Sequence, residues 1–318
     1  MSLTRGKSVS YSRYLMDLPN AAAALDPLLG ELIFRPFQEG EHRTESVGSC
    51  SYRSLFDGPI DRGFLEGSQN YLCGIRRDVK KAPAGLVQAQ TARDVADYMQ
   101  TCGGKPSKIH IKEIKAEVRD SLNQAAQPKP SHSTLLADIG RGMALLDGST
   151  AAHSPFIGKL ALRQFYEEYD DVLEWFTWAG SNPDSQVATI WPEREATWKR
   201  DKEAITLKHG FNVNGSLLAG ASLGMKMCRG RFSLVVGDLS CKLTLDLDGL
   251  KVSALEFPEE VLALSGDLES RTAARCEFIM GVESALAALV ADYLERLQEG
   301  ILPAEFLACL GEVEAAVA

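Results

Sequence analysis

Five basic residues between positions 105 and 119 recur at spacings of three and four, which is the repeat of an α-helix. They are Lys105, Lys108, Lys112, Lys115 and Arg119. At about 100° per residue, these cations fall within a stripe roughly 80° wide on one side of the helix. Such a stripe is typical of an anion-binding surface, and nucleic acid is the obvious large anion. A Lys-rich face that is only solvated has the same spacing and stays the alternative.

A second stripe on the same helix is apolar and lies next to the cations, roughly 90° away. Its members follow each other at spacings of three, four and four: Ile111, Ile114, Val118 and Leu122. The apolar stripe predicts that the helix packs on a core. The basic residues then form a ridge along the edge of that contact.

Another group of basic residues lies in the second half of the chain, around predicted strands. Its members are Lys208, His209, Lys226, Arg229 and Arg231. Because they lie on segments that flank one loop, we expect them to converge on one side of a sheet and to contact phosphates. The alternative is that Arg229 and Arg231 pair with nearby carboxylates on the protein surface.

The composition excludes several classes of protein. The chain has 318 residues, of which 45% are hydrophobic and 24% charged, and its net charge is -9. It is therefore not coated in positive charge, although a local basic surface remains compatible with it. No apolar run approaches the roughly 18 residues of a membrane helix. The seven dispersed cysteines include no CxxC pair, which indicates reduced cytosolic thiols, so we expect a cytoplasmic protein.

Motifs for common enzyme chemistry are missing from the sequence. It contains no GxxxxGK[ST], GxGxxG or HExxH motif. The run Asp246-Leu-Asp248-Gly249 lacks the remaining ligands of a calcium loop, and a hairpin turn explains it better. We therefore expect no catalytic residue, no metal and no cofactor. A metal-dependent nuclease stays an alternative, because a sequence does not show whether distant carboxylates converge on a cation.

The predicted elements mix strands and helices without regular alternation, which favours an α+β fold. Strands are expected at residues 9–15, 50–55, 71–76, 204–209 and 232–236. Hairpins are expected at residues 135–147 and 242–255, and a loop at 124–133. Helices are expected at residues 20–32, 91–102 with Thr91 as N-cap, 172–179 with two buried Trp residues, and 268–297. We divide the chain into an N-terminal region, 1–150, and a C-terminal region, 151–318.

Several segments along nearly the whole chain form a distinctive series. The main one is KAEVRDSL at 115–122, followed by a loop and the strand pair at 135–139 and 142–147. Further segments of the series lie at 34–36, 72–83, 173–178, 223–226, 232–236 and 255–257. In type and order these segments resemble the recombination-associated protein RdgC family. One departure is the loop at 124–133, which carries only Lys129 where the family usually has Arg and Phe residues.

The resemblance implies a ring-shaped homodimer that binds duplex DNA without sequence preference and restrains a RecA-type recombinase, with no catalysis. It places Lys208 and His209 on a DNA-contacting finger and Lys226 at the lysine of a Gly-x-x-Lys segment. The helix from Lys105 to Arg119 matches the family's Lys-rich helix. We accordingly expect a nucleoid-associated protein. The alternative on the same fold is a protein-binding inhibitor or scaffold with little DNA affinity.

Overall fold

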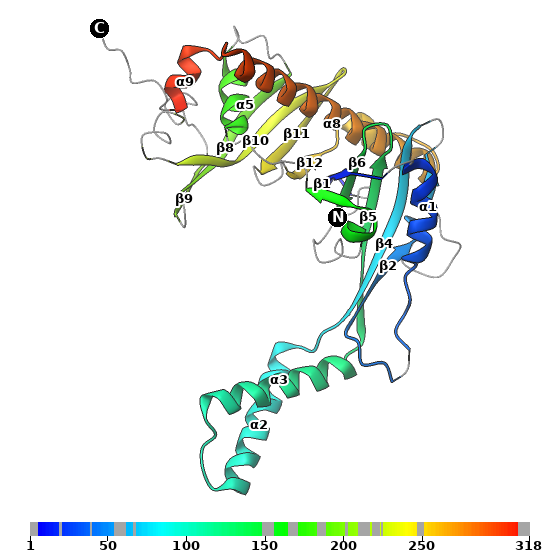
Figure 1. The fold of residues 1–318 in the computed structure, drawn as a ribbon, viewed down its shortest axis with the longest axis vertical. Coiled ribbons are helices and arrows are strands. Elements are labelled where there is room, and N and C mark those ends of the chain that lie inside the picture. Colours follow the sequence, from blue (N-terminus) through cyan, green and yellow to red (C-terminus); the bar gives the residue numbers. More distant parts are fainter. Residues whose placement is uncertain are drawn as a thin grey trace.

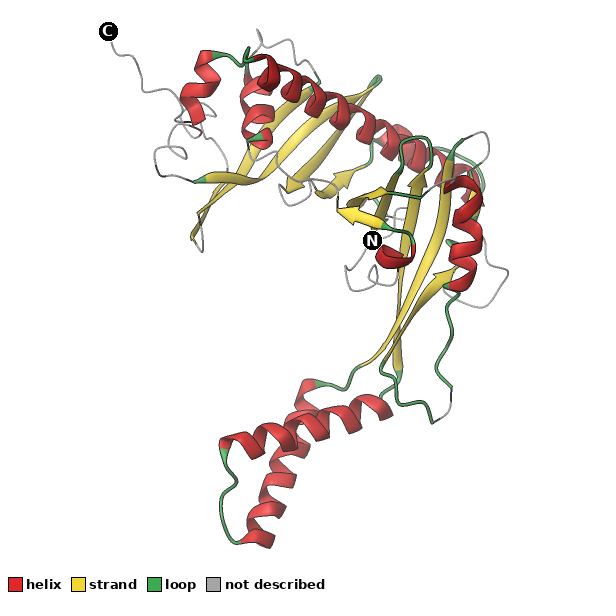
Figure 2. Ribbon diagram, in the orientation of Figure 1, coloured by secondary structure: helices red, strands yellow, loops and turns green. Residues whose placement is uncertain are grey.

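The fold is α+β, as predicted, and is built on one large antiparallel sheet (Figure 2). The structure is a computed structural model that describes residues 6–18, 21–38, 40–53, 62–65, 68–147, 156–164, 171–182, 189–200, 203–208, 217, 223, 225–246 and 251–310. Within these ranges the sheet has twelve strands, in the order β2-β4-β5-β6-β1-β12-β11-β10-β8-β9. In addition, β3 pairs with β4 and β7 pairs with β1.

Both predicted hairpins are part of this sheet. The strands are β1 (Ser8–Met16), β2 (Glu45–Cys50), β3 (Gly63–Phe64), β4 (Asn70–Lys80), β5 (Pro128–Asp138), β6 (Met143–Asp147), β7 (Leu162–Gln164), β8 (Ile190–Arg200), β9 (Glu203–Lys208), β10 (Lys226–Val236), β11 (Leu239–Asp246) and β12 (Lys251–Glu256). Pairing of β5 with β6 and of β11 with β12 confirms both predicted hairpins. The predicted turn at Asp248-Gly249 lies outside the described residues.

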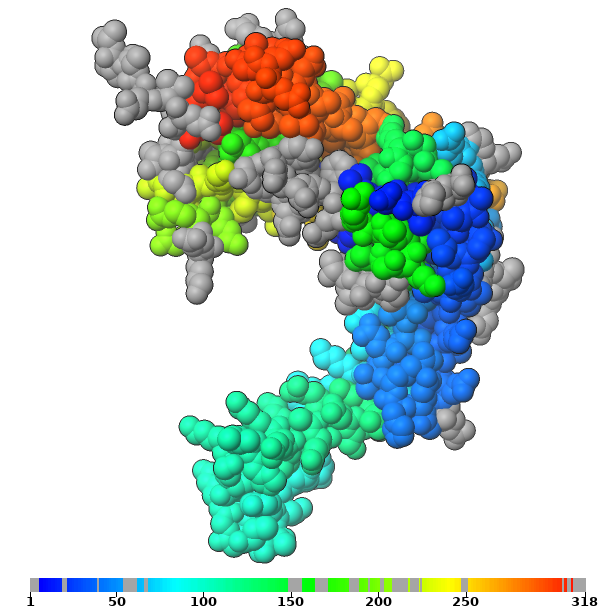
Figure 3. All heavy atoms as spheres, in the orientation of Figure 1, coloured from blue at the N-terminus to red at the C-terminus, as the bar shows by residue number. Residues whose placement is uncertain are grey.

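The helices lie around the sheet and at one end of it (Figure 1). They are α1 (Ala21–Glu31), α2 (Ala84–Cys102), α3 (Lys108–Ala125), α5 (Val172–Ser181), α7 (Glu259–Leu262), α8 (Leu268–Glu299) and α9 (Ala304–Leu310). The long helix α8 runs along the sheet, whereas α2 and α3 form an arm that projects from the far ends of β4 and β5. The body and the arm together make a crescent around a hollow (Figure 3).

The middle of the sheet is covered on both faces, which explains the continuous apolar runs of β5 and β6. Successive residues of a strand point to opposite faces. Leu136 and Leu145 pack into a core with α8, whereas their neighbours Leu135 and Leu146 pack into a second core with α1. Trp175, on α5, is fully buried in the first core, which confirms the predicted apolar helix there.

A buried ion pair joins α8 to β1. The Glu283 carboxylate accepts a hydrogen bond from the Tyr11 hydroxyl at 2.6 Å and one from Arg13 Nη2 at 3.0 Å. Arg13 Nε lies 2.7 Å from the other carboxylate oxygen, and both charged side chains are almost completely buried. Burial and the Glu283 charge raise the pKa of Tyr11 well above its ordinary value, so the phenol remains a donor.

Three predictions about the elements were wrong. The strand expected at 50–55 ends at Cys50 and instead begins at Glu45. Thr91 is not an N-cap, because α2 already begins after Pro83 and the Thr91 hydroxyl donates to the Val87 carbonyl within the helix. Residues 128–133 are not a loop but the start of β5.

The two errors that concern strands have tertiary causes. At Gly48 an added Cβ would lie 2.3 Å from Phe34 Cα, so a close chain crossing puts glycine inside β2, where it weakens the strand pattern. Pro128 and Pro130 suggested a loop. They are tolerated because this part of β5 pairs with β4 alone, and β6 joins only from Leu135 onward. An edge position does not need the missing N–H groups.

Candidate nucleic-acid interface

The arm is a helical hairpin held by a small core. Gly103 ends α2 in the left-handed conformation, with φ of 68°, and its N–H donates to the Met99 carbonyl. The side chain of Ser107 caps α3 by accepting the N–H of His110. The buried residues of the arm core are Ala82, Val87 and Val118, with Ile114 and Leu122 packed beside them. The predicted apolar stripe of α3 is therefore confirmed at Ile114, Val118 and Leu122.

The basic stripe lies on the arm as one exposed row. Lys108, Lys112, Lys115 and Arg119 are all exposed on α3, whereas Lys105 precedes the helix. In the part of the chain that the structure describes, no carboxylate forms an ion pair with any of these five cations. The acidic residues of α3 fall on the other side of the helix, at Glu113, Glu117 and Asp120. The arm thus presents uncompensated positive charge on an acidic protein.

The second basic group is arranged differently, because the three cations whose side chains the structure describes have acidic partners. Lys226 Nζ lies 3.5 Å from Asp171, Arg229 Nε lies 3.4 Å from Asp246, and Arg231 Nη2 lies 2.7 Å from Glu256. Exposed pairs of this kind add little stability. They nevertheless place a negative charge beside each cation, which a phosphate would have to displace. This arrangement favours surface pairing as the role of these residues.

The structure also separates Lys208 from Lys226. Lys208 lies opposite Glu195 of β8, and Lys226 lies opposite Lys199 of the same strand. Four residues along a strand span about 13 Å, and β8 lies between the two lysines, so their backbones do not converge. The side chain of Lys208 and all of His209 lie outside the described residues.

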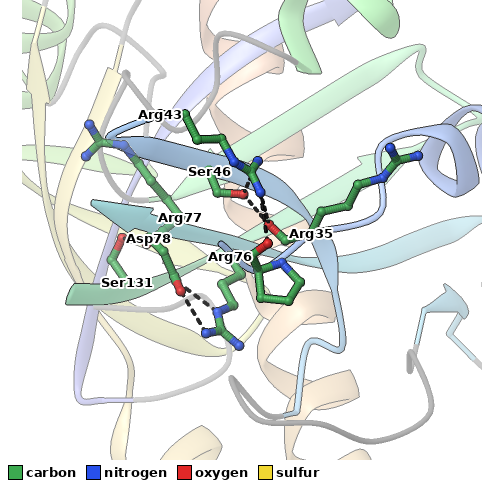
Figure 4. Close-up of polar contacts among 8 residues, drawn as sticks. Arg35, Arg43, Ser46, Arg76, Arg77, Asp78 and Ser131 are labelled. Carbon is green, nitrogen blue, oxygen red and sulfur yellow. Dashed lines mark hydrogen bonds and ion pairs between the residues drawn. The ribbon is translucent and has the colours of Figure 1, made fainter. Parts of the chain in front are cut away.

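Arginines at the base of the arm carry no periodic signal, so nothing in the sequence singles them out. In Figure 4 the Arg43 guanidinium donates to the carbonyl oxygens of Arg35 and Pro36, at 3.1 and 2.9 Å. Arg76 makes two hydrogen bonds of 2.8 Å to Asp78 (Figure 4). Its guanidinium also lies over the Phe34 ring, 4.3 Å from the ring centre. The Arg43 bonds hold the segment before β2 in its own conformation. The contact between Arg76 and Phe34 joins this segment to β4, from which the arm projects.

A buried carboxyl group lies beside the second basic group. Glu174, on α5, is 5% exposed, and its Oε1 accepts the N–H of Met227. Its Oε2 has no hydrogen-bond partner among the described residues. Burial raises the pKa of Glu174 to about 8; Asp171 adds to this effect, while the Met227 N–H and Lys226 oppose it.

The titration of Glu174 predicts how stability depends on pH. The folded protein holds this proton up to about pH 8, whereas the unfolded chain releases it near pH 4.5. As the pH rises from about 4.5 to about 8, the free energy of unfolding should therefore fall, by up to about 1.4 kcal/mol per pH unit. We expect Glu174→Gln to be more stable than the parent at pH 8.5 and similar to it at pH 5, as measured by urea unfolding. An equal difference at both pH values would contradict this assignment.

A metal site and a membrane-spanning helix find no support among the described residues. No group of three or more His, Cys, Asp and Glu side chains there is placed to hold a metal ion. No helix among those residues is long and apolar enough to cross a membrane.

No protein-family profile matches this sequence, and no curated protein matches it. The basic stripe of the arm is the best candidate interface, because its cations form one exposed row that has no carboxylate partner among the described residues.

Proposed function

We propose that this protein binds duplex DNA without sequence preference, chiefly through the basic stripe on α3. The observation that carries the proposal is that Lys108, Lys112, Lys115 and Arg119 form one exposed row without carboxylate partners in the described chain. A row of cations contacts the phosphate backbone, which has the same charge at every base pair. Binding of this kind needs no catalytic residue and no cofactor.

The second part of the proposal concerns assembly. The resemblance to the RdgC family suggests a homodimer that closes into a ring, and the crescent shape of the chain is compatible with it (Figure 3). Two crescents related by a two-fold axis would enclose a common hole, with one arm from each copy. A ring on duplex DNA would modulate a RecA-type recombinase by occupying its substrate, and it would be associated with the nucleoid.

Fluorescence anisotropy at two salt concentrations tests the proposed function. Four phosphate contacts give a slope of about -3.6 in log K against log salt, so duplex affinity should drop roughly 100-fold between 50 and 200 mM salt. Linear duplex, circular duplex and single strands should be compared, together with the mass of the protein at micromolar concentration. A slope near zero would favour the scaffold alternative, and magnesium-dependent cleavage would favour the nuclease. A strictly monomeric mass would remove the ring.

A further inference from the structure

A cleft of about 590 Å³ opens at the base of the arm, between the start of α2 and the second half of α3. Two residues of the basic stripe, Lys115 and Arg119, line it from successive turns of α3. Lys81 lines it from the segment between β4 and α2, and Asn123 lies one turn beyond Arg119. The first half of the stripe, Lys108 and Lys112, lies outside the cleft.

The polar groups of this cleft are almost all hydrogen-bond donors. Lys81, Lys115 and Arg119 are exposed and form no ion pair with any other residue that the structure describes. Asn123 uses its Oδ1 to accept the N–H of Ala82 at 2.9 Å, which fixes the amide and leaves its NH₂ group as a donor. None of the described residues that line the cleft carries a carboxylate. Such a lining matches a ligand that only accepts hydrogen bonds and carries negative charge.

The first turn of α2 adds to the same positive potential. Ala84 lines the cleft at the start of this helix, and its N-cap is Pro83, which makes no side-chain capping bond. The N-terminal end of a helix carries a partial positive charge. The volume lies within the roughly 300–1,000 Å³ of ordinary ligand sites, so the cleft is large enough for a phosphate with its flanking sugars.

We propose that this cleft is a phosphate-binding site that holds one backbone phosphate of the bound DNA. Lys81, Lys115, Arg119 and the Asn123 amide supply its donors. The cleft then fixes where the nucleic acid crosses the arm, whereas Lys108 and Lys112 add attraction without fixing a position. The identification of the phosphate with DNA rests on the proposed function. The phosphate chemistry of the cleft does not.

Calorimetric titration of the full chain with inorganic pyrophosphate tests the site without DNA. We expect saturable binding of one pyrophosphate per chain, at least tenfold weaker in Lys81→Ala and in Arg119→Ala. The matched control Lys108→Ala removes a cation from the same stripe outside the cleft and should stay within about twofold of the parent. Gln88→Glu adds a carboxylate to the lining without removing a donor, and it should also weaken binding at least tenfold. Circular dichroism checks that these surface variants fold.

The same variants, titrated with duplex DNA, identify the source of the phosphate. Arg119→Ala and Lys81→Ala should weaken DNA binding about tenfold, and Lys108→Ala about threefold. Absence of pyrophosphate binding in the parent, or equal effects of Arg119→Ala and Lys108→Ala on it, would overturn the site. Equal effects on DNA alone would overturn its role in DNA binding and leave the proposed function standing. Arg119-dependent pyrophosphate binding in a protein without DNA affinity would support the site and overturn the proposed function.

Discussion

Joint replacement of Lys108, Lys112 and Lys115 with Glu is expected to abolish DNA binding and to leave the protein folded. Each change turns a positive charge into a negative one, so the arm would repel the phosphate backbone. All three side chains are exposed, and the arm core on the adjacent face of α3 is untouched. Anisotropy with a labelled duplex at 50 mM salt measures the loss, and circular dichroism measures the helix content.

The other side of α3 provides the matched control. Neutralising Glu113, Glu117 and Asp120 with Gln, Gln and Asn also alters three charges on this helix, but it removes repulsion. We expect DNA affinity to stay the same or rise slightly in that variant. If the Lys-to-Glu protein folds and still binds duplex like the parent, the stripe is only a solvated face and the proposed interface is wrong.

The largest effect on stability is expected for Glu283→Ala. This change leaves the Arg13 guanidinium buried without its carboxylate partner and removes the acceptor of the Tyr11 hydroxyl. Breaking a buried ion pair by removing one partner typically costs about 3–5 kcal/mol, mostly because the remaining charge is uncompensated. Urea unfolding at neutral pH should therefore show a markedly lower midpoint.

A double variant separates this cause from simple loss of packing. In Arg13→Met with Glu283→Leu neither charge of this ion pair remains, and apolar groups of similar volume fill the space. We expect it to recover most of the stability that Glu283→Ala loses. A double variant as unstable as Glu283→Ala would show that the loss of stability comes from packing between α8 and β1 and not from the unpaired Arg13 charge.

Elements with a strong repeat could be predicted from the sequence. The spacing of Cys276, Ile279, Val282 and Leu286 gives α8, and these residues are indeed buried. The 3-4 spacing of the cations likewise gives the one-sided stripe of α3. Strand β2 and the start of β5 could not be predicted, because the glycine and the prolines there are explained by contacts with distant segments and not by a local pattern.

The acidic partners of the second basic group could not be predicted for the same reason. Arg231 meets Glu256 and Lys226 meets Asp171 only because distant segments come together in the folded chain. Nothing in the spacing of either cation indicates its partner. The cleft at the base of the arm could not be predicted either, because Lys81 lies far from Arg119 in sequence. Only the hairpin of α2 and α3 brings the two residues together.

The position of β1 in the middle of the sheet also has a consequence for synthesis on the ribosome. Ser8 pairs with Glu256 of β12, so the first part of this edge of β1 has no partner until a segment almost 250 residues later has been made. At about 5–20 residues per second, that delay is roughly 10–50 s. Strand β6 is made much earlier and pairs with the opposite edge. A nascent chain therefore carries an open strand edge for that time, which is the kind of surface that recruits other chains into aggregates and that chaperones protect.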